Sequence, residues 1–165
     1  MSIRECVQCA ATTKSGARCK NRTCIYSEFC ATHTKALFDL AIKPSGIASA
    51  SKGLFTTKYI KKGAKIAKYT GDIKTQAAYN ANDSGYGIAI SNGRILDAAS
   101  TQSDLGRYAN DCRRANRNAR ECKGNNSRFS VSNKKGESTV WVVATRNILA
   151  NTEVFIPYGR GYWSQ

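Results

Sequence analysis

Short apolar runs separated by tight turns make up most of the chain. The run 52–60 has strand composition, and 65–69 alternates apolar and polar positions across a Lys-Lys-Gly turn. Asn92-Gly93 is a strong hairpin signal and predicts that the runs on either side of it pair. A further hairpin is expected around the turn at 133–138. Helical patterns are confined to three stretches: 31–42, 75–80 and 104–110. The chain is therefore predicted to be mainly β.

The hairpin at 57–66 recurs near the other end of the chain, at 145–154. Aligned position by position, the segments share a threonine, a cation, an isoleucine, a turn glycine or asparagine and a β-branched residue. This indicates two similar β units, although motifs this short also recur by chance. After the second unit, Pro157 restricts the strand to an edge or a bend, and Tyr158-Gly159 breaks it. The tyrosine hydroxyl should point into the cleft beside the strand end.

The chain carries a large excess of positive charge. Its 165 residues include 26 Lys and Arg against 11 Asp and Glu, a formal net charge of +15, and the excess occurs on both sides of residue 50. This charge favours a polyanionic partner, nucleic acid above all; the alternative is that it only aids solubility. With 41% hydrophobic and 22% charged residues, the composition is that of a folded domain.

Secretion and membrane signals are not expected in this sequence. The first thirty residues are polar and rich in cysteine, and no apolar run approaches the ~18 residues of a membrane span. We therefore expect a protein of the nucleus or cytoplasm of a eukaryotic host cell, or of a virion interior, that is neither secreted nor bound to a membrane.

Five of the seven cysteines lie in the first 30 residues, followed by the only histidine: Cys6, Cys9, Cys19, Cys24, Cys30 and His33. An odd total without a secretion signal argues against disulfides, whereas thiolates and an imidazole at short spacing suit a structural Zn²⁺ site. The four ligands that we choose are Cys9, Cys19, Cys30 and His33. Cys6 and Cys24 are alternates for one of these positions, or buried thiols.

The run 13–19 resembles a small Cys/His knuckle found ahead of many viral and microbial domains. A metal in it would replace the core that some forty residues cannot build. The segment from Pro44 to Ser51 is small and polar and reads as a join. We predict two domains: a zinc-binding module at 1–43 and the main domain at 44–165.

Four short motifs follow one another along the main domain, and their order is informative. They are Lys52-Gly53-Leu54-Phe55, Tyr69-Thr70-Gly71, 107–112 (RYANDC) and 153–159 (EVFIPYG). Together they resemble the SET domain, the fold of most protein-lysine methyltransferases, whose motifs read roughly GxGLFA, YxGE, RFINHSCxPN and GEELxxxYG. The resemblance covers about residues 46–163. It implies small twisted sheets with the last strand threaded through a preceding loop, a C-terminal pseudoknot that brings the last two motifs together.

The resemblance also implies a cofactor and a site. S-adenosylmethionine would donate its methyl group to a neutral lysine amine, with Tyr158 as catalytic tyrosine and Tyr86 as a channel tyrosine that bonds the amine. Cofactor contacts are implied for Lys52, Gly53, Leu54, Tyr108, Asn110, Asp111, Tyr158 and Trp163. The alternatives are a structural Tyr158 bonded to the backbone and a Trp163 that merely plugs the core. Arg107 is interpreted as structural, and Ile156 as leaving room for more than one methyl.

Departures from the family pattern bear on activity. Ser51 replaces the first glycine of GxG, and Asp111 replaces the histidine after Asn110, so that a carboxylate is expected near the sulfonium. No cysteine-rich segment follows Trp163. A second subunit is one way to close such a site, since compact viral members of the family lack that segment and work as dimers.

The leading hypothesis is a methyltransferase acting on histones or another basic protein. It would reach chromatin through nucleosomal DNA, using its basic surface and the four arginines of 113–120. The rival hypothesis is a catalytically inactive SET-like module that binds DNA or nucleosomes.

Overall fold

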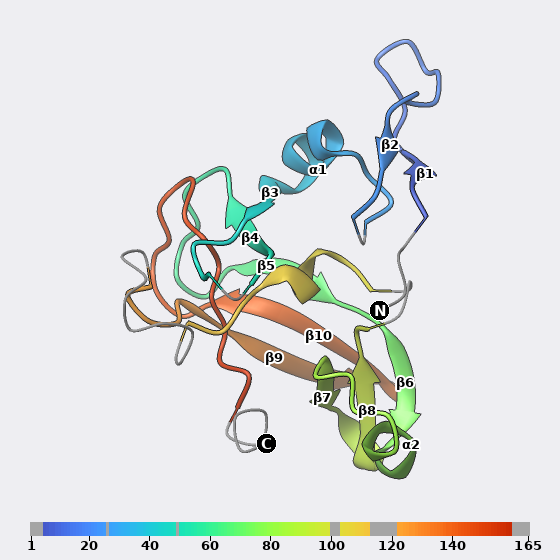
Figure 1. Cartoon of the computed structure of the whole chain (residues 1–165), viewed down its shortest axis with the longest axis vertical. Coiled ribbons are helices and arrows are strands. Elements are labelled where there is room, and N and C mark those ends of the chain that lie inside the picture. The colour runs from blue at the N-terminus through green and yellow to red at the C-terminus, as the bar shows by residue number, and fades with distance from the viewer. Residues whose placement is uncertain (1–4, 26, 49, 100–102, 113–121, 160–165) are drawn as a thin grey trace.

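The computed structural model describes the chain except residues 1–4, 26, 49, 100–102, 113–121 and 160–165. Small antiparallel sheets form its body, and an N-terminal module lies to one side (Figure 1). The module contains the paired strands β1 (Val7–Gln8) and β2 (Arg22–Thr23) and the helix α1 (Ala31–Phe38). No helix in these described ranges is long and apolar enough to cross a membrane.

The described part of the body contains three sheets. The first pairs β3 (Leu40–Pro44) with β4 (Lys52–Thr56). The second has the order β5–β10–β9, with bounds Lys65–Tyr69, Glu137–Ala144 and Ser127–Lys134. The third has the order β6–β8–β7, with bounds Asp72–Thr75, Arg94–Asp97 and Gly87–Ala89. Short helical segments lie at α2 (Gln76–Asn80) and at two 3-10 turns, Ser91–Gly93 and Leu105–Tyr108.

Two of the predicted hairpins are confirmed, whereas the one at 57–66 is not, because β4 pairs with β3 and β5 pairs with β10. β7 and β8 pair around Asn92 and Gly93, whose φ angles of 59° and 63° are the left-handed values that this residue pair tolerates. β9 and β10 pair along their full length around the turn at 135–136.

Two predicted helices are shorter than expected. The helix expected over 31–42 ends at Phe38, because Asp39 adopts a left-handed conformation and Leu40 then begins β3. Leu40 is buried and pairs with Thr56 of β4, so tertiary packing overrides the helical composition. The segment before residue 44 therefore contributes a strand to the body, and the division of the chain at residue 43 stays a prediction. Of 104–110, only Leu105–Tyr108 is helical, as a 3-10 turn.

The two similar segments at 57–66 and 145–154 pair with each other. Ile60 and Ile148, which occupy equivalent positions in the two, form an antiparallel bridge in which each N–H donates to the other's carbonyl at 2.9 Å. Ile148 lies in the main core, which also contains Leu54, Val142 and Val154, and Ile60 packs against that core. The resemblance between the segments thus corresponds to one paired structural unit.

The last described segment is threaded between two others. Phe155 bridges Asn110 in parallel, and the N–H of Ile156 donates to the Asn110 carbonyl at 2.9 Å. On the other side, the Phe155 carbonyl accepts from the N–H groups of Asn126 (3.1 Å) and Ser127 (2.9 Å). This is the expected pseudoknot, and it brings the motifs at 107–112 and 153–159 together.

Asp97, at the end of β8, carries a buried carboxylate. It accepts hydrogen bonds from Lys74 Nζ (2.6 Å), Ser84 Oγ (2.6 Å) and the Ala99 N–H (3.0 Å). Burial alone would raise the pKa of Asp97, but these donors outweigh it and lower that pKa below its usual value. Gly71 allows the backbone at Asp97 to approach closely, since a Cβ at residue 71 would lie 2.1 Å from the Asp97 carbonyl oxygen.

We expect Asp97→Asn to lower the free energy of unfolding by roughly 1–3 kcal/mol at pH 7, because its amide nitrogen cannot accept a hydrogen bond and Lys74 loses its charged partner. A carboxyl whose pKa is lowered by folding stabilises the protein above its unfolded pKa of ~3.9, and this contribution is lost as the pH falls through the folded pKa. Urea unfolding should therefore show the difference between variant and wild type shrinking below pH ~4. The exposed Glu137→Gln is the control, and a difference independent of pH would contradict this account.

Candidate active site and metal centre

Tyr158 is held at the crossing of the threaded strand and the loop at 109–111. Its N–H donates to Asp111 Oδ2 at 2.8 Å, and its hydroxyl donates to the Ala109 carbonyl at 3.2 Å. The same hydroxyl lies 3.4 Å from Asn110 Oδ1. Backbone and side chain are therefore both fixed by a single loop.

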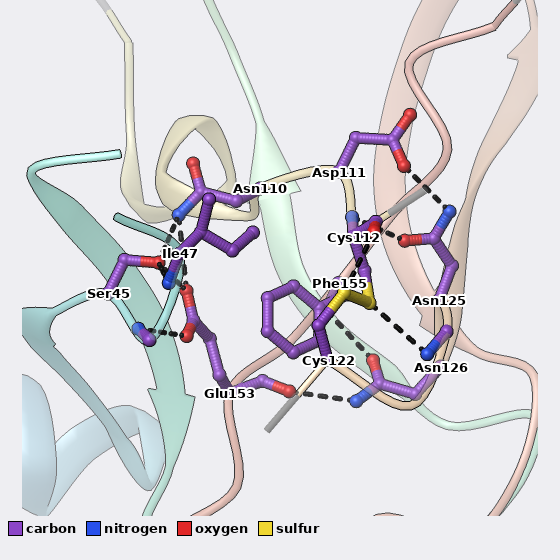
Figure 2. The surroundings of a disulfide bond; sticks show 12 residues. Ser45, Ile47, Asn110, Asp111, Cys112, Cys122, Asn125, Asn126, Glu153 and Phe155 are labelled. Atoms are coloured by element: carbon purple, nitrogen blue, oxygen red, sulfur yellow. Dashed lines mark hydrogen bonds between the residues drawn. A yellow bond between two sulfur atoms is a disulfide. The ribbon is translucent and has the colours of Figure 1, made fainter. Parts of the chain in front are cut away.

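Asn110 belongs to a polar cluster that joins four segments (Figure 2). Its Nδ2 donates to the Lys52 carbonyl (2.9 Å) and to Glu153 Oε1 (3.1 Å). Glu153 also accepts from Ser45 Oγ (2.6 Å) and the Gly46 N–H (2.9 Å). Glu153 was not predicted as a site residue, although it stands five positions before Tyr158 in the same motif.

Tyr158 also belongs to the lining of a pocket of about 420 Å³. Its aromatic and apolar lining includes Tyr69, Tyr86, Phe129, Ile156 and Tyr158, and its polar lining includes Gln76, Asn80, Asp83 and Arg107. The two tyrosines implied as catalytic thus line the same pocket. Whether Ile156 leaves room for more than one methyl stays a prediction.

Tyr69 and Arg107 fix Tyr86 in the pocket wall. The Tyr69 hydroxyl donates to the Tyr86 carbonyl at 2.8 Å, and the Arg107 guanidinium lies 4.5 Å from the centre of the Tyr86 ring. Burial raises the pKa of Tyr69, so its hydroxyl stays protonated and remains a donor. Arg107 also donates to Ser103 Oγ (2.9 Å), which agrees with the structural role expected for it. Tyr69 was recognised only as a motif residue, and its contact with the pocket comes from the fold.

The carboxylate of Asp111 is engaged within the protein. Besides the Tyr158 N–H it accepts from Asn125 Nδ2 at 2.9 Å, and only 2% of the residue is exposed (Figure 2). The departure from the family histidine therefore places an anchor for Tyr158 at this position.

The remaining predicted cofactor residues lie at the start of β4 and beside it. Lys52 contributes its carbonyl to the Asn110 cluster. The side chain of Leu54 is fully buried in the main core, so that only its backbone is available at the site, and the partly buried Tyr108 packs against that core. Gly53 lies against Glu153. Trp163 lies outside the described residues. The cofactor contacts themselves stay predictions.

Two disulfides contradict the expectation of free thiols. Cys6 pairs with Cys24, and Cys112 pairs with Cys122, because the fold brings their Cα atoms to 4.2 Å and 5.6 Å. The alternates Cys6 and Cys24 are thereby removed from the metal site. The second disulfide ties the loop carrying Asp111 to the segment carrying Asn125 (Figure 2).

The four chosen metal ligands form one cluster in the N-terminal module. The ligand atoms of Cys9, Cys19, Cys30 and His33 all lie within 4.8 Å of one another. Tetrahedral zinc would hold such atoms roughly 3.4–3.8 Å apart, so this soft, nitrogen-and-sulfur donor set fits the ion. Burial tends to raise the pKa of Cys30, but hydrogen bonds from His33 and Asn21 outweigh it and lower that pKa to about 6. This favours the thiolate that a metal requires.

Comparison with known proteins agrees with the threaded fold. The family model for the SET domain matches residues 51–159, which is more than half of the chain. The chain belongs to the SET-domain family. Proteins with this domain are in general lysine methyltransferases that use S-adenosylmethionine. No curated protein matches the chain in sequence.

Solved structures share the SET fold at low sequence identity. They include a humanized mutant of the Chaetomium thermophilum Polycomb Repressive Complex 2 bound to an inhibitor, with a TM-score of 0.58 and 21% identity. The match covers 73% of this chain and 15% of that one. ATXR5 in complex with a mono-methylated histone H3.1 gives a TM-score of 0.58 and 19% identity, covering 73% of this chain and 56% of that one. The chain thus spans between a seventh and just over half of these larger proteins.

Metal analysis of the purified protein should find about one zinc per chain. Cys19→Ser should lose most of this zinc and lower the melting temperature, because it removes a ligand from a module with little core of its own. Mass spectrometry of the metal content measures the first effect. Cys24→Ser is the matched control and should keep its zinc, since Cys24 pairs with Cys6. Equal zinc in all three proteins would contradict the assignment.

Proposed function

We propose that the protein is an S-adenosylmethionine-dependent protein-lysine N-methyltransferase that acts on histones or another basic protein of chromatin. The observation that carries the proposal is the position of Tyr158. It lines the aromatic pocket, and its hydroxyl lies 3.4 Å from Asn110 Oδ1. A group in the pocket and a group held by Asn110 would therefore meet at one phenol.

The pocket suits the side chain of a lysine substrate. Tyr86, Phe129 and Ile156 offer little solvation to a charged ammonium, which lowers the pKa of an entering amine from its reference value of ~10.4. The amine can then attack in its neutral form. Tyr158 stays oriented throughout, because its hydroxyl donates a hydrogen bond to the Ala109 carbonyl.

The Asn110 side of the site suits the methyl donor. S-adenosylmethionine, when bound, supplies a methyl group on a sulfonium. Asn110 would hold its amino-acid end, with the backbone of Lys52 to Leu54 and of Asp111 beside it. Tyr108 and Trp163 complete the predicted contacts. What this chain contributes is orientation of two reactants, which is worth several orders of magnitude in rate.

DNA is the partner that we propose for the basic surface, on the outer face of the sheet β5–β10–β9. Trp141 of β10 lies there beside Lys65 and Lys68 of β5, whose Nζ atoms are 4.8 Å and 5.6 Å from its ring centre. Arg128 on β9 pairs with Val143 and belongs to the same face. Charge would attract this face to a phosphate backbone and would not attract a basic histone tail. Chromatin would thus be reached through its DNA, in the nucleus.

An inactive module that binds DNA or nucleosomes is the second candidate. Ser51 and Asp111 favour it, because they depart from the family pattern on the side of the cofactor. The internal contacts of Asp111 weaken that argument, since its carboxylate already accepts from Tyr158 and Asn125.

Incubation with labelled S-adenosylmethionine and nucleosomes, free histones or a cell lysate should transfer label to protein. Tyr158→Phe should reduce this transfer by about 10²-fold or more, because the site loses its oriented hydroxyl. Tyr59→Phe, at an exposed position, is the matched control. Equal label from Tyr158→Phe and wild type would contradict the catalytic assignment. Cofactor binding without transfer of label to any protein would favour the inactive module. The absence of both cofactor binding and transfer would favour it as well.

We expect the double variant Lys65→Glu, Lys68→Glu to bind duplex DNA at least tenfold more weakly, because it reverses two charges next to Trp141. Its dependence on salt concentration should become shallower, which fluorescence anisotropy at several salt concentrations measures. The double variant Lys14→Glu, Lys20→Glu changes the net charge equally in the N-terminal module. An equal loss of DNA affinity in both variants would mean that binding depends only on the net charge of the protein and not on this face.

A further inference from the structure

Glu153 places a buried negative charge in the Asn110 cluster. Only 4% of the residue is exposed, and its carboxylate accepts from Ser45 Oγ, the Gly46 N–H and Asn110 Nδ2. All three donors are neutral, and neither of the salt bridges found among the described residues involves Glu153. A buried carboxylate offset only by neutral donors favours a cation nearby.

Glu153 also determines which way the Asn110 amide points. Nδ2 has three acceptors around it: the Lys52 carbonyl (2.9 Å), Glu153 Oε1 (3.1 Å) and Ser45 Oγ (3.3 Å). The Ser45 hydroxyl gives its proton to Glu153, so its oxygen can accept from Asn110. A flipped amide would set Oδ1 against these acceptors, so the network fixes Oδ1 on the side of the Tyr158 hydroxyl, 3.4 Å away.

Gly53 makes this arrangement possible. A Cβ at residue 53 would lie 2.1 Å from Glu153 Oε1, closer than any real contact. Glycine at this motif position therefore leaves room for the carboxylate. The family resemblance implies a cofactor contact for the same glycine, and the fold adds this second role.

We propose that Glu153 is the positioning residue for recognition of the ligand's α-ammonium group. Its carboxylate turns the Asn110 carbonyl oxygen toward the ligand and adds a negative charge that favours a cation there. The inference rests on the proposed function, because the ligand is the amino-acid end of S-adenosylmethionine or of the product S-adenosylhomocysteine. It concerns binding, and so it is measurable without turnover.

The test compares two ligands by calorimetry. S-adenosylhomocysteine carries the amino-acid end, whereas 5′-methylthioadenosine keeps the adenosine and a neutral sulfur but lacks it. Glu153→Gln keeps the shape, removes the charge and sets an amide donor against existing donors. We expect it to weaken binding of S-adenosylhomocysteine by about tenfold or more and to change that of 5′-methylthioadenosine by less than about twofold.

Ser45→Ala is the second variant, for the case in which Glu153→Gln does not fold. It removes the donor at 2.6 Å and keeps the charge, so a smaller loss with the same ligand selectivity is expected. Ser132→Ala, on β9, is its matched control.

Each outcome either supports the role proposed for Glu153 or overturns it. A loss confined to S-adenosylhomocysteine supports the proposal. An equal loss for both ligands would show that Glu153 only stabilises the fold, and no loss would show that Asn110 is oriented without it; either overturns the proposal while the proposed function stands. If the wild-type protein binds neither ligand, the proposed function falls, and this inference falls with it.

Discussion

Hydrogen bonds of the Phe155 backbone fix the threaded strand, and the site depends on them. Its N–H donates to Asn126 Oδ1 at 2.9 Å, and its carbonyl accepts from the N–H groups of Asn126 and Ser127. Buried backbone groups must be paired, so the strand has one place to lie between the two segments that flank it. Glu153 and Tyr158 stand on that strand, and Asn110 stands on the loop beside it. Their mutual distances follow from the threading.

Two buried carboxylates then turn this crossing into an oriented site. Glu153 holds the Asn110 amide, and Asp111 holds the backbone N–H of Tyr158. Each accepts from neutral donors that come from different segments, so each also joins parts of the chain that are distant in sequence. Such networks specify one arrangement because a half-satisfied carboxylate in the interior is costly. Replacement of the family histidine by Asp111 is compatible with an ordered Tyr158 for this reason.

The N-terminal module is held together by different means. Its described hydrophobic core is small and consists of three cysteines and one alanine, Ala11, with Phe29 packed alongside. The Cys/His cluster and the Cys6–Cys24 disulfide link its strands to α1 and to each other. β3 then connects the module to β4, so the module is anchored to the sheet next to the Asn110 cluster. A disulfide and a cluster of donor atoms that fits a metal ion substitute here for apolar area.

The sequence by itself determined the elements whose signals are local. Asn92-Gly93 and the turn before Glu137 fixed two hairpins, because few residues tolerate those backbone angles. Motif order identified the SET fold, and the four residues chosen from six candidate ligands are the ones that form the cluster. The tertiary structure decided what depends on contacts between distant residues. Leu40 became a strand residue because burial against β4 outweighs helical composition, and Cys112 met Cys122 because the knot aligns their loops. The roles of Glu153, Asp111 and Tyr69 were decided in the same way. The role of a buried polar group depends on its hydrogen-bond partners, and these partners are distant in sequence and cannot be read from the order of residues.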